Sequence, residues 1–214
     1  MIRIGRRLTI AMLSLSALSL ARAQHPTPDA NDLPSQLSLA ARQTIVHLAD
    51  SLRSVHLPDR PLYDKAAEGV LKGAEDTRIV TAVRTLAREL GEARSALGDG
   101  AEAADLVAAA SALHVGATPA MLSQLRDTQR AAGGTAVSLA TPLVALADLL
   151  SRHVPAPAAA SAIGALVARR APNDDFAALR AGVERDIDAG RTPETAVTQR
   201  AQSIIKSIDA RGRP

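Results

Sequence analysis

The sequence predicts an all-α protein, and three observations lead to that prediction. Tyr63 and Phe176 are the only aromatic residues among 214, so Ala, Leu, Val and Ile must fill the core. Alanine favours helix and lets helix axes approach closely. Apolar residues recur at alternating spacings of four and three, as on one face of a helix, and no segment shows the two-residue alternation of a strand. We expect about eight helices, packed as a bundle or a short α-solenoid, with a probable internal duplication.

Residues 1–23 have the three parts of a secretory signal peptide. A basic start and an apolar run are followed by an Ala-x-Ala cleavage site that ends at Ala23. The apolar run covers residues 8–20, which is short of the roughly 20 residues that a spanning helix needs. We therefore expect cleavage between Ala23 and Gln24, a periplasmic or secreted protein, and no membrane span after cleavage.

The net charge of the chain and its lack of cysteine limit the kinds of partner and the kinds of catalytic or metal-binding chemistry that we expect. The chain has 25 Lys and Arg against 22 Asp and Glu, and four of the arginines lie in residues 1–23. Without that segment the chain is close to neutral, which gives no electrostatic reason to expect nucleic acid as a partner. The absence of cysteine excludes disulfides, thiolate metal ligands and cysteine nucleophiles.

The first part of the expected domain, residues 36–210, contains three helices. Residues 24–35 are rich in Pro and Asp and predict a flexible spacer. Ser35 then caps a helix that stops before Pro58, because a residue before proline disfavours helical geometry. A second helix covers 61–72 and ends at a glycine. The third covers 76–97. Apolar positions mark the buried faces of the first and third helices: Ala41, Ile45, Leu48, Leu52 and Val55; Ile79, Val83, Leu86, Leu90, Ala93 and Leu97.

A helical hairpin, 101–133, follows, with Gly116 as the stop of its first arm and Thr118-Pro119 as the cap of the second. The next helix covers 138–153. A helix to Arg170 comes after it, and then a helix from Asn173. The C-terminal helix covers 193–209. The buried face of the helix at 138–153 is expected at Leu139, Leu143, Leu146 and Leu150.

Two similar segments predict an internal duplication. Residues 46–58, VHLADSLRSVHLP, and residues 144–155, VALADLLSRHVP, align at an offset of 98 that becomes 97 after one deletion. The repeat units would be 38–98 and 138–190, with the hairpin 101–133 between them. If they are copies, Leu48 and Leu146 lie in equivalent buried positions, and Pro58 and Pro155 in equivalent turns. Chance similarity between alanine-rich helices is the alternative.

Residues 57–98, LPDRPLYDKAAEGVLKGAEDTRIVTAVRTLARELGEARSALG, resemble segments of an uncharacterised exported α-helical protein family of Gram-negative bacteria. Those segments combine an LP-x-x-P-L start, a KGA turn and a helix dotted with arginine. The resemblance implies an exported helical protein. It carries no activity and no functional residue.

Histidine and aspartate are the first candidates for chemistry. None of the five histidines lies three or four residues from another on a helix, and no HExxH motif is present. His56 and His153 recur at matching positions, which we interpret as last-turn residues that suit the helix dipole. Asp50 and Asp148 also recur. Two facing carboxylates could act as acid and base or hold a cation. Ion pairs with Arg53 and Arg152, three and four residues on, are the simpler interpretation.

Other motifs give no site. Asp186, Asp188 and Glu194 hint at a calcium loop, but Arg191 and Val197 occupy the positions where such a loop needs glycine and glutamate. No nucleotide-binding or serine-hydrolase motif is present. We therefore assign no catalytic, cofactor-binding or metal residues.

These observations favour an exported, non-enzymatic helical protein with an interaction or scaffold role in the bacterial cell envelope. Its partner is unknown, and we expect an envelope protein. The alternative is a bundle that binds a small ligand or metal ion in its interior. A roomy cavity lined by Asp, His or Arg from both halves would favour the alternative, and a tight Leu and Ala interior would favour the first.

Overall fold

The computed structural model describes residues 32–133 and 138–211, which fold into nine α-helices and no strand. The all-α prediction is confirmed. Every segment expected to be helical is helical, and nine helices are present where about eight were expected. The signal-peptide prediction and residues 24–31 of the spacer lie outside the described residues. The helices are α1 (Leu39–Ser54), α2 (Arg60–Leu71), α3 (Asp76–Leu97), α4 (Ala103–His114), α5 (Pro119–Ala131), α6 (Ala140–Ser151), α7 (Ala156–Ala168), α8 (Asn173–Asp188) and α9 (Pro193–Arg211).

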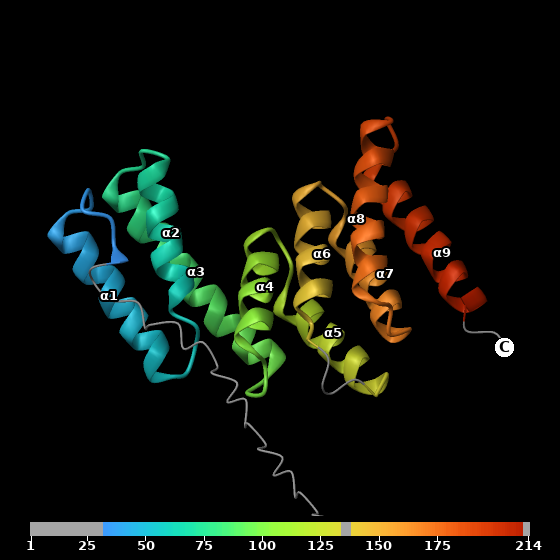
Figure 1. Ribbon diagram of the computed structural model, residues 1–214, viewed down its shortest axis with the longest axis horizontal. Helices are drawn as coiled ribbons and strands as arrows, with labels where there is room; N and C mark the ends of the chain where they lie inside the picture. The colour runs from blue at the N-terminus through green and yellow to red at the C-terminus, as the bar shows by residue number, and fades with distance from the viewer. Residues whose placement is uncertain (1–31, 134–137, 212–214) are drawn as a thin grey trace, which may run out of the picture.

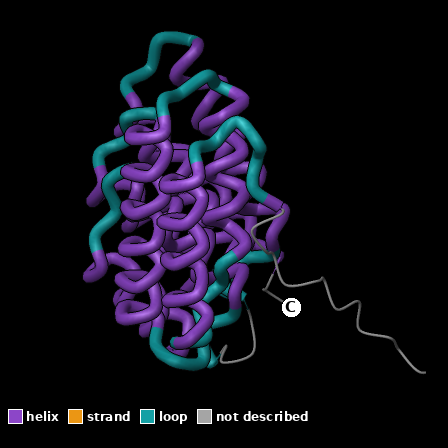
Figure 2. Tube along the Cα trace, turned by 90° about the vertical axis from the view of Figure 1, so that its left-hand side faces the viewer, coloured by secondary structure: helices purple, strands orange, loops and turns teal. Residues whose placement is uncertain are grey.

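The helices form a two-layer row that runs from α1 to α9 (Figure 1). The odd-numbered helices contact one another in chain order, and so do α4, α6 and α8. All substantial contacts join helices at most two positions apart in the chain. Viewed along the row, the helices stack one behind another (Figure 2). An open array of this kind, in which each unit packs on its neighbours, is a short α-solenoid.

The even-numbered layer has one break. Helix α2 packs on α1 and α3, but it makes no substantial contact with α4. The side of α3 that faces this break is therefore left without a covering helix. The groove described below lies there.

The first helix begins later than predicted, while the packed domain begins earlier. Ser38, not Ser35, caps α1, since its Oγ accepts a hydrogen bond from the Ala41 amide at 3.3 Å. Leu33 and Leu37 are buried in the core. Leu33 of the predicted spacer therefore packs against the domain.

The buried faces follow the predicted spacing in α6 and depart from it in α1. All four predicted leucines of α6 are buried. In α1 the buried positions are Ala41, Ile45, Ala49 and Leu52, whereas Leu48 is half-buried and Val55 is exposed. A helix repeats every 3.6 residues, so the buried line passes nearer to Ala49 than to Leu48.

Leu48, which was predicted to be buried, is thus only half-buried, whereas Leu146 is buried as predicted. Helix α6 lies inside the row and contacts α4, α7 and α8, so Leu146 is fully covered. Helix α1 is at the end of the row and has fewer neighbours.

The turns after α1 and α6 have the same geometry. His56 and His153 lie just beyond their helices, not in the last turn as predicted, with left-handed φ angles of 58° and 61°. In each turn the amide of the next residue donates a hydrogen bond to the carbonyl oxygen five residues earlier. Leu57 donates to Leu52 at 2.9 Å, and Val154 donates to Leu149 at 3.1 Å. This is the Schellman ending of a helix. The internal duplication stays a prediction.

None of the helices among the described residues combines the length and the hydropathy needed to cross a membrane.

Candidate functional site

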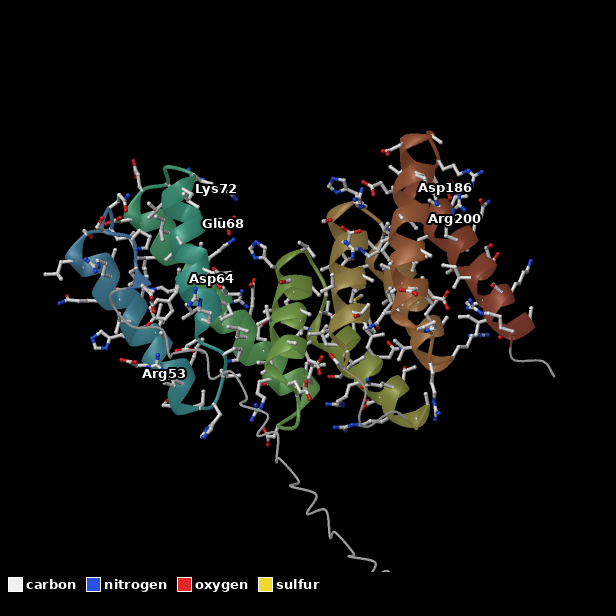
Figure 3. The ribbon with its side chains drawn as sticks, in the orientation of Figure 1. Arg53, Asp64, Glu68, Lys72, Asp186 and Arg200 are labelled. Carbon is white, nitrogen blue, oxygen red and sulfur yellow. The ribbon has the colours of Figure 1, made fainter. Side chains whose placement is uncertain are left out.

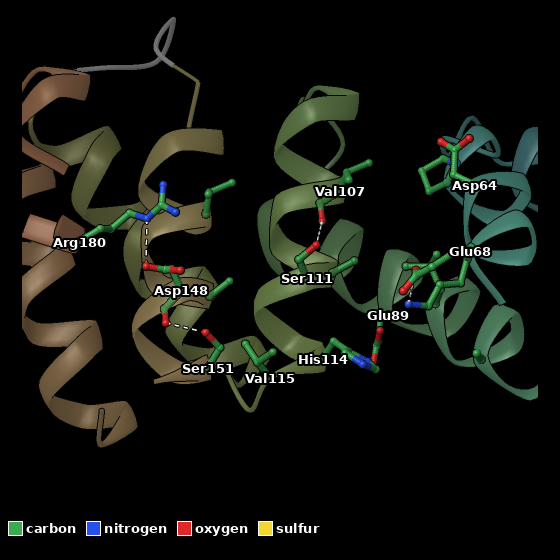
Figure 4. Close-up of a pocket in the computed structure, with 17 residues that line it drawn as sticks. Asp64, Glu68, Glu89, Val107, Ser111, His114, Val115, Asp148, Ser151 and Arg180 are labelled. Carbon is green, nitrogen blue, oxygen red and sulfur yellow. Dashed lines mark hydrogen bonds and ion pairs between the residues drawn. The ribbon is translucent and has the colours of Figure 1, made fainter. Parts of the chain in front are cut away.

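A groove of about 620 Å³ lies at the break in the even-numbered layer. Five helices line it: α2, α3, α4, α6 and α8. Figure 4 shows Asp148 and Arg180 at one end, Val107, Ser111 and Val115 in the middle, and Asp64 and Glu68 at the other end. The groove therefore draws on residues more than 100 positions apart in the chain.

The middle of the groove is apolar. Val115 and Val144, 36% and 42% exposed, are two of the few large apolar residues that the described part of the chain exposes. Leu86 forms part of the wall and is half-buried, although its position on α3 predicted burial. The reason is the break in the layer, since no helix closes over this side of α3. Exposed apolar side chains gathered in one groove are typical of a binding surface.

The α2 end of the groove carries two carboxylates that have close cations. Glu68 accepts hydrogen bonds from Lys72 and Lys65, and these bonds lower the pKa of its carboxyl to about 2. Asp64 pairs with Arg60 at 3.0 Å. Both charges are therefore compensated within α2 itself.

Glu89 is the third carboxylate at this end, and its surroundings differ. Its side chain is 5% exposed, although it lies on the wall of a groove. His114 Nδ1 lies 3.3 Å from Oε1, and the Arg88 guanidinium lies 3.7 Å from the same oxygen. Arg88 makes its closer contact with Glu92. Among the described residues, none donates a hydrogen bond to Glu89 Oε2.

The α6 end of the groove holds an ion-pair network around Asp148. Its Oδ2 accepts hydrogen bonds from Arg152 Nε at 3.3 Å and from Arg180 Nε at 3.1 Å. Arg152 also contacts Glu184 at 2.9 Å. The predicted pairing with Arg152 is confirmed, but Asp148 lines the groove and is 21% exposed, so the prediction that it points to solvent is wrong.

Asp50 behaves as predicted. It is exposed and pairs with Arg53 at 2.6 Å (Arg53 is labelled in Figure 3). Asp50 does not line the groove that holds Asp148. The two recurring aspartates therefore do not form a shared carboxylate site.

The hint of a calcium loop at residues 186–197 resolves into a helix junction. Asp186 is buried and bound by Arg200 through two hydrogen bonds of 2.6 and 2.7 Å, which join α8 to α9 (Figure 3). Gly190 ends α8 with a left-handed φ of 88°. Within residues 32–133 and 138–211, no three His, Asp or Glu side chains gather in a way that would hold a metal ion.

Sequence reasoning named two groove residues, Leu86 and Asp148, for other reasons, and it missed the groove. The remaining lining residues share no linear motif, because five helices contribute them. One signal was available in Glu89, a carboxylate beside Leu90 and Leu86 on the apolar face of α3. A charge on a buried face is rare unless it is paired or functional.

No protein-family model, curated protein or solved structure matches this chain.

Proposed function

We propose that the protein binds a segment of another polypeptide in the groove, as a non-enzymatic interaction protein of the bacterial cell envelope. The observation that carries the proposal is the open groove, with Val115 and Val144 exposed in its middle. Helical solenoids use such surfaces, shared between several helices, to bind extended partners. The envelope location rests on the secretory pattern of residues 1–23.

A polypeptide fits the groove better than a small molecule does. Small-molecule sites enclose about 70–90% of the ligand surface. This groove is open to solvent, and its exposed large apolar residues are Val115, just after α4, and Val144 of α6. A partner helix or extended segment can cover both at once.

The interior offers less support for the alternative of a ligand or metal bound inside the bundle. Only three charged residues are buried among the described residues: Glu89, Asp105 and Asp186. Asp105 accepts a hydrogen bond from Ser138 at 2.6 Å, and Asp186 is held by Arg200. The rest of the buried set is Leu, Ala, Val and Ile with Tyr63, Phe176, Pro142 and Gly182.

Site-specific photo-crosslinking in the cells that make the protein tests this function. The benzophenone amino acid p-benzoylphenylalanine replaces Val144 in the groove and, as a matched control, Leu39, which is 72% exposed and outside the groove. Both positions already expose an apolar side chain, so neither change should disturb the fold. Mass spectrometry then identifies what each position captures.

We expect a covalent adduct with a second polypeptide from position 144 and none from position 39. An adduct with a lipid or metabolite at position 144 would contradict the proposed polypeptide partner. The proposal would also fail if position 144 gave no adduct, or if both positions captured the same set of proteins.

A further inference from the structure

Glu89 has a buried carboxylate, and one of its two oxygens accepts no hydrogen bond from the described residues. Its Oε1 receives both of its contacts, from His114 and Arg88, while no described residue donates to Oε2. Oε2 is not an enclosed atom without a partner, since no such side-chain atom occurs among the described residues. It therefore keeps some exposure to solvent, and Glu89 is one of the residues that line the groove.

The charge of Glu89 is also poorly compensated. Arg88 is 3.7 Å away and makes its shorter contact with Glu92, and His114 adds a positive charge only when it is protonated. Asp64 and Glu68 nearby are already paired with cations of α2. A buried carboxylate in a low-dielectric wall gains most from a cationic hydrogen-bond donor.

We propose that the groove selects a partner segment in which a Lys or Arg side chain binds Glu89 Oε2. This inference rests on the proposed function and names the chemistry of its partner. The aliphatic stem of the basic residue packs along Leu86 at the wall, and its charged end reaches the carboxylate. Apolar residues of the same segment cover Val115 and Val144. The partner is thus a basic and apolar segment, not an acidic one.

A peptide selection on the full chain provides the test. A random dodecapeptide phage library is selected on the immobilised protein, and the peptides recovered are synthesised with a fluorophore. Fluorescence anisotropy gives Kd for the wild-type protein and three variants: Glu89→Gln, Val144→Asp and the control Glu102→Gln. Glu102 is exposed and lies outside the groove. A peptide with its basic residue changed to Met is measured as well, which leaves the protein intact.

We expect recovered peptides to share a Lys or Arg with apolar neighbours, and Glu89→Gln to raise Kd by about tenfold or more. Glu102→Gln should leave Kd unchanged. The Lys→Met or Arg→Met peptide should bind the wild-type protein as weakly as the unchanged peptide binds Glu89→Gln. Combining the changed peptide with Glu89→Gln should cause no further loss of affinity, because either change alone already removes the contact.

Two kinds of failure can be told apart. Peptides that lose binding to Val144→Asp but bind Glu89→Gln as well as wild type overturn the role of Glu89 and leave the groove function intact. Recovered peptides that bind in the groove but contain no basic residue would also overturn the role of Glu89 and leave the groove function intact. Peptides that bind Val144→Asp as tightly as wild type do not use the groove, and both the proposed function and this inference then fail.

Discussion

At the scale of single residues, the ends of the helices divide into two chemical groups. Helices α2, α3, α4, α5 and α8 are followed by a glycine with a positive φ angle, at Gly73, Gly98, Gly116, Gly133 and Gly190. Helices α1, α6 and α7 place His56, His153 and Arg170 in that conformation instead, with φ angles of 58°, 61° and 52°. A residue with a Cβ pays about 1–2 kcal/mol for this geometry, which glycine adopts freely.

Replacing one of these histidines by glycine should therefore stabilise the protein. We expect His153→Gly to raise the free energy of unfolding by about 0.5–1 kcal/mol, since relief of the left-handed strain exceeds the entropy that glycine adds to the unfolded chain. His153 is exposed, so no packing is lost. Urea denaturation followed by circular dichroism measures the change. The reverse substitution, Gly116→Ala, should lower the same free energy, and a gain there would contradict the argument.

The Asp186–Arg200 pair predicts a specific pH dependence. Hydrogen bonds from Arg200 hold the pKa of Asp186 below its usual value. A carboxyl with a lowered folded-state pKa stabilises the fold above its unfolded pKa of about 3.9, and loses that contribution as the pH falls through the folded-state value. Asp186→Asn should thus be less stable than wild type at pH 7, and the difference should shrink as the pH falls below 4.

Denaturation curves at pH 7, 5, 4 and 3 measure that difference. Asp127→Asn is the control, because Asp127 is exposed and its pair with Arg126 lies on the surface. It should show little change at any pH. A gap between wild type and Asp186→Asn that stayed constant down to pH 3 would show that ionisation of Asp186 is not its source.

Residue contacts close in sequence could be predicted, while those far apart could not. The pairs Asp50–Arg53 and Asp148–Arg152 follow from helical spacing alone. The contact of Arg180 with Asp148 joins α8 to α6 and depends on how the two helices pack. Glu89 was recognisable as a charge on an apolar face, but its free oxygen is a property of the assembled groove.

At the scale of helices, Gly69 shows how closely α2 and α3 approach, and Gly91 provides a comparison without a close neighbour. A Cβ added at Gly69 of α2 would lie 2.7 Å from Cγ1 of Ile79, which is 2% exposed and has little room to move. A Cβ added at Gly91 of α3 would meet no atom within 4 Å. Both glycines lie inside helices, where alanine is favoured by about 1 kcal/mol. Gly69 lies in the last turn of α2 and Gly91 lies well inside α3, and the two sites differ in what packs against them.

These two sites therefore make a matched pair of substitutions with opposite signs. We expect Gly91→Ala to raise the free energy of unfolding by about 0.5–1 kcal/mol. Gly69→Ala should lower it, because overpacking a tight contact costs about 1–3 kcal/mol and exceeds the gain in helix propensity. Thermal and urea denaturation of both variants provide the comparison. A stabilised Gly69→Ala would mean that α2 and α3 can separate at no cost.

Helix existence was predictable because its signals are local, and the buried faces were predictable only in part. Thr118 caps α5 and Gly116 ends α4 as expected, since each signal acts on its own backbone. The identity of the buried residues depends on neighbours. The predicted line of α6 is correct because that helix is enclosed, whereas Leu86 of α3 faces the break between α2 and α4. Spacing alone contains no information about a missing neighbour.

At the scale of the whole molecule, stability should be unequal along the row. Helices α4 and α6 have the most extensive mutual packing, and α1 and α9 each have neighbours on one side only. We expect backbone amides of α4 and α6 to exchange hydrogen slowest and those of α1 and α9 fastest, because end units of a solenoid open first. Hydrogen exchange with mass spectrometry measures this profile. Equal protection of all nine helices would instead indicate a single cooperative unit.

The row architecture also explains why the groove was invisible in the sequence. The groove lies where α2 makes no substantial contact with α4, and five separate helices line it. Its residues have no common spacing along the chain, so they form no linear motif of the kind that marks familiar active sites. The all-α fold class, in contrast, could be predicted from amino-acid composition and the spacing of apolar residues alone.

The confinement of contacts to helices no more than two positions apart has a kinetic consequence. Each contact closes only a short loop of chain, so little entropy is lost before packing energy is gained. Chains with such local topology fold quickly, and assembly can start in any stretch and spread to both ends. A chain of this topology can therefore fold helix by helix while it is being synthesised, without waiting for its far end.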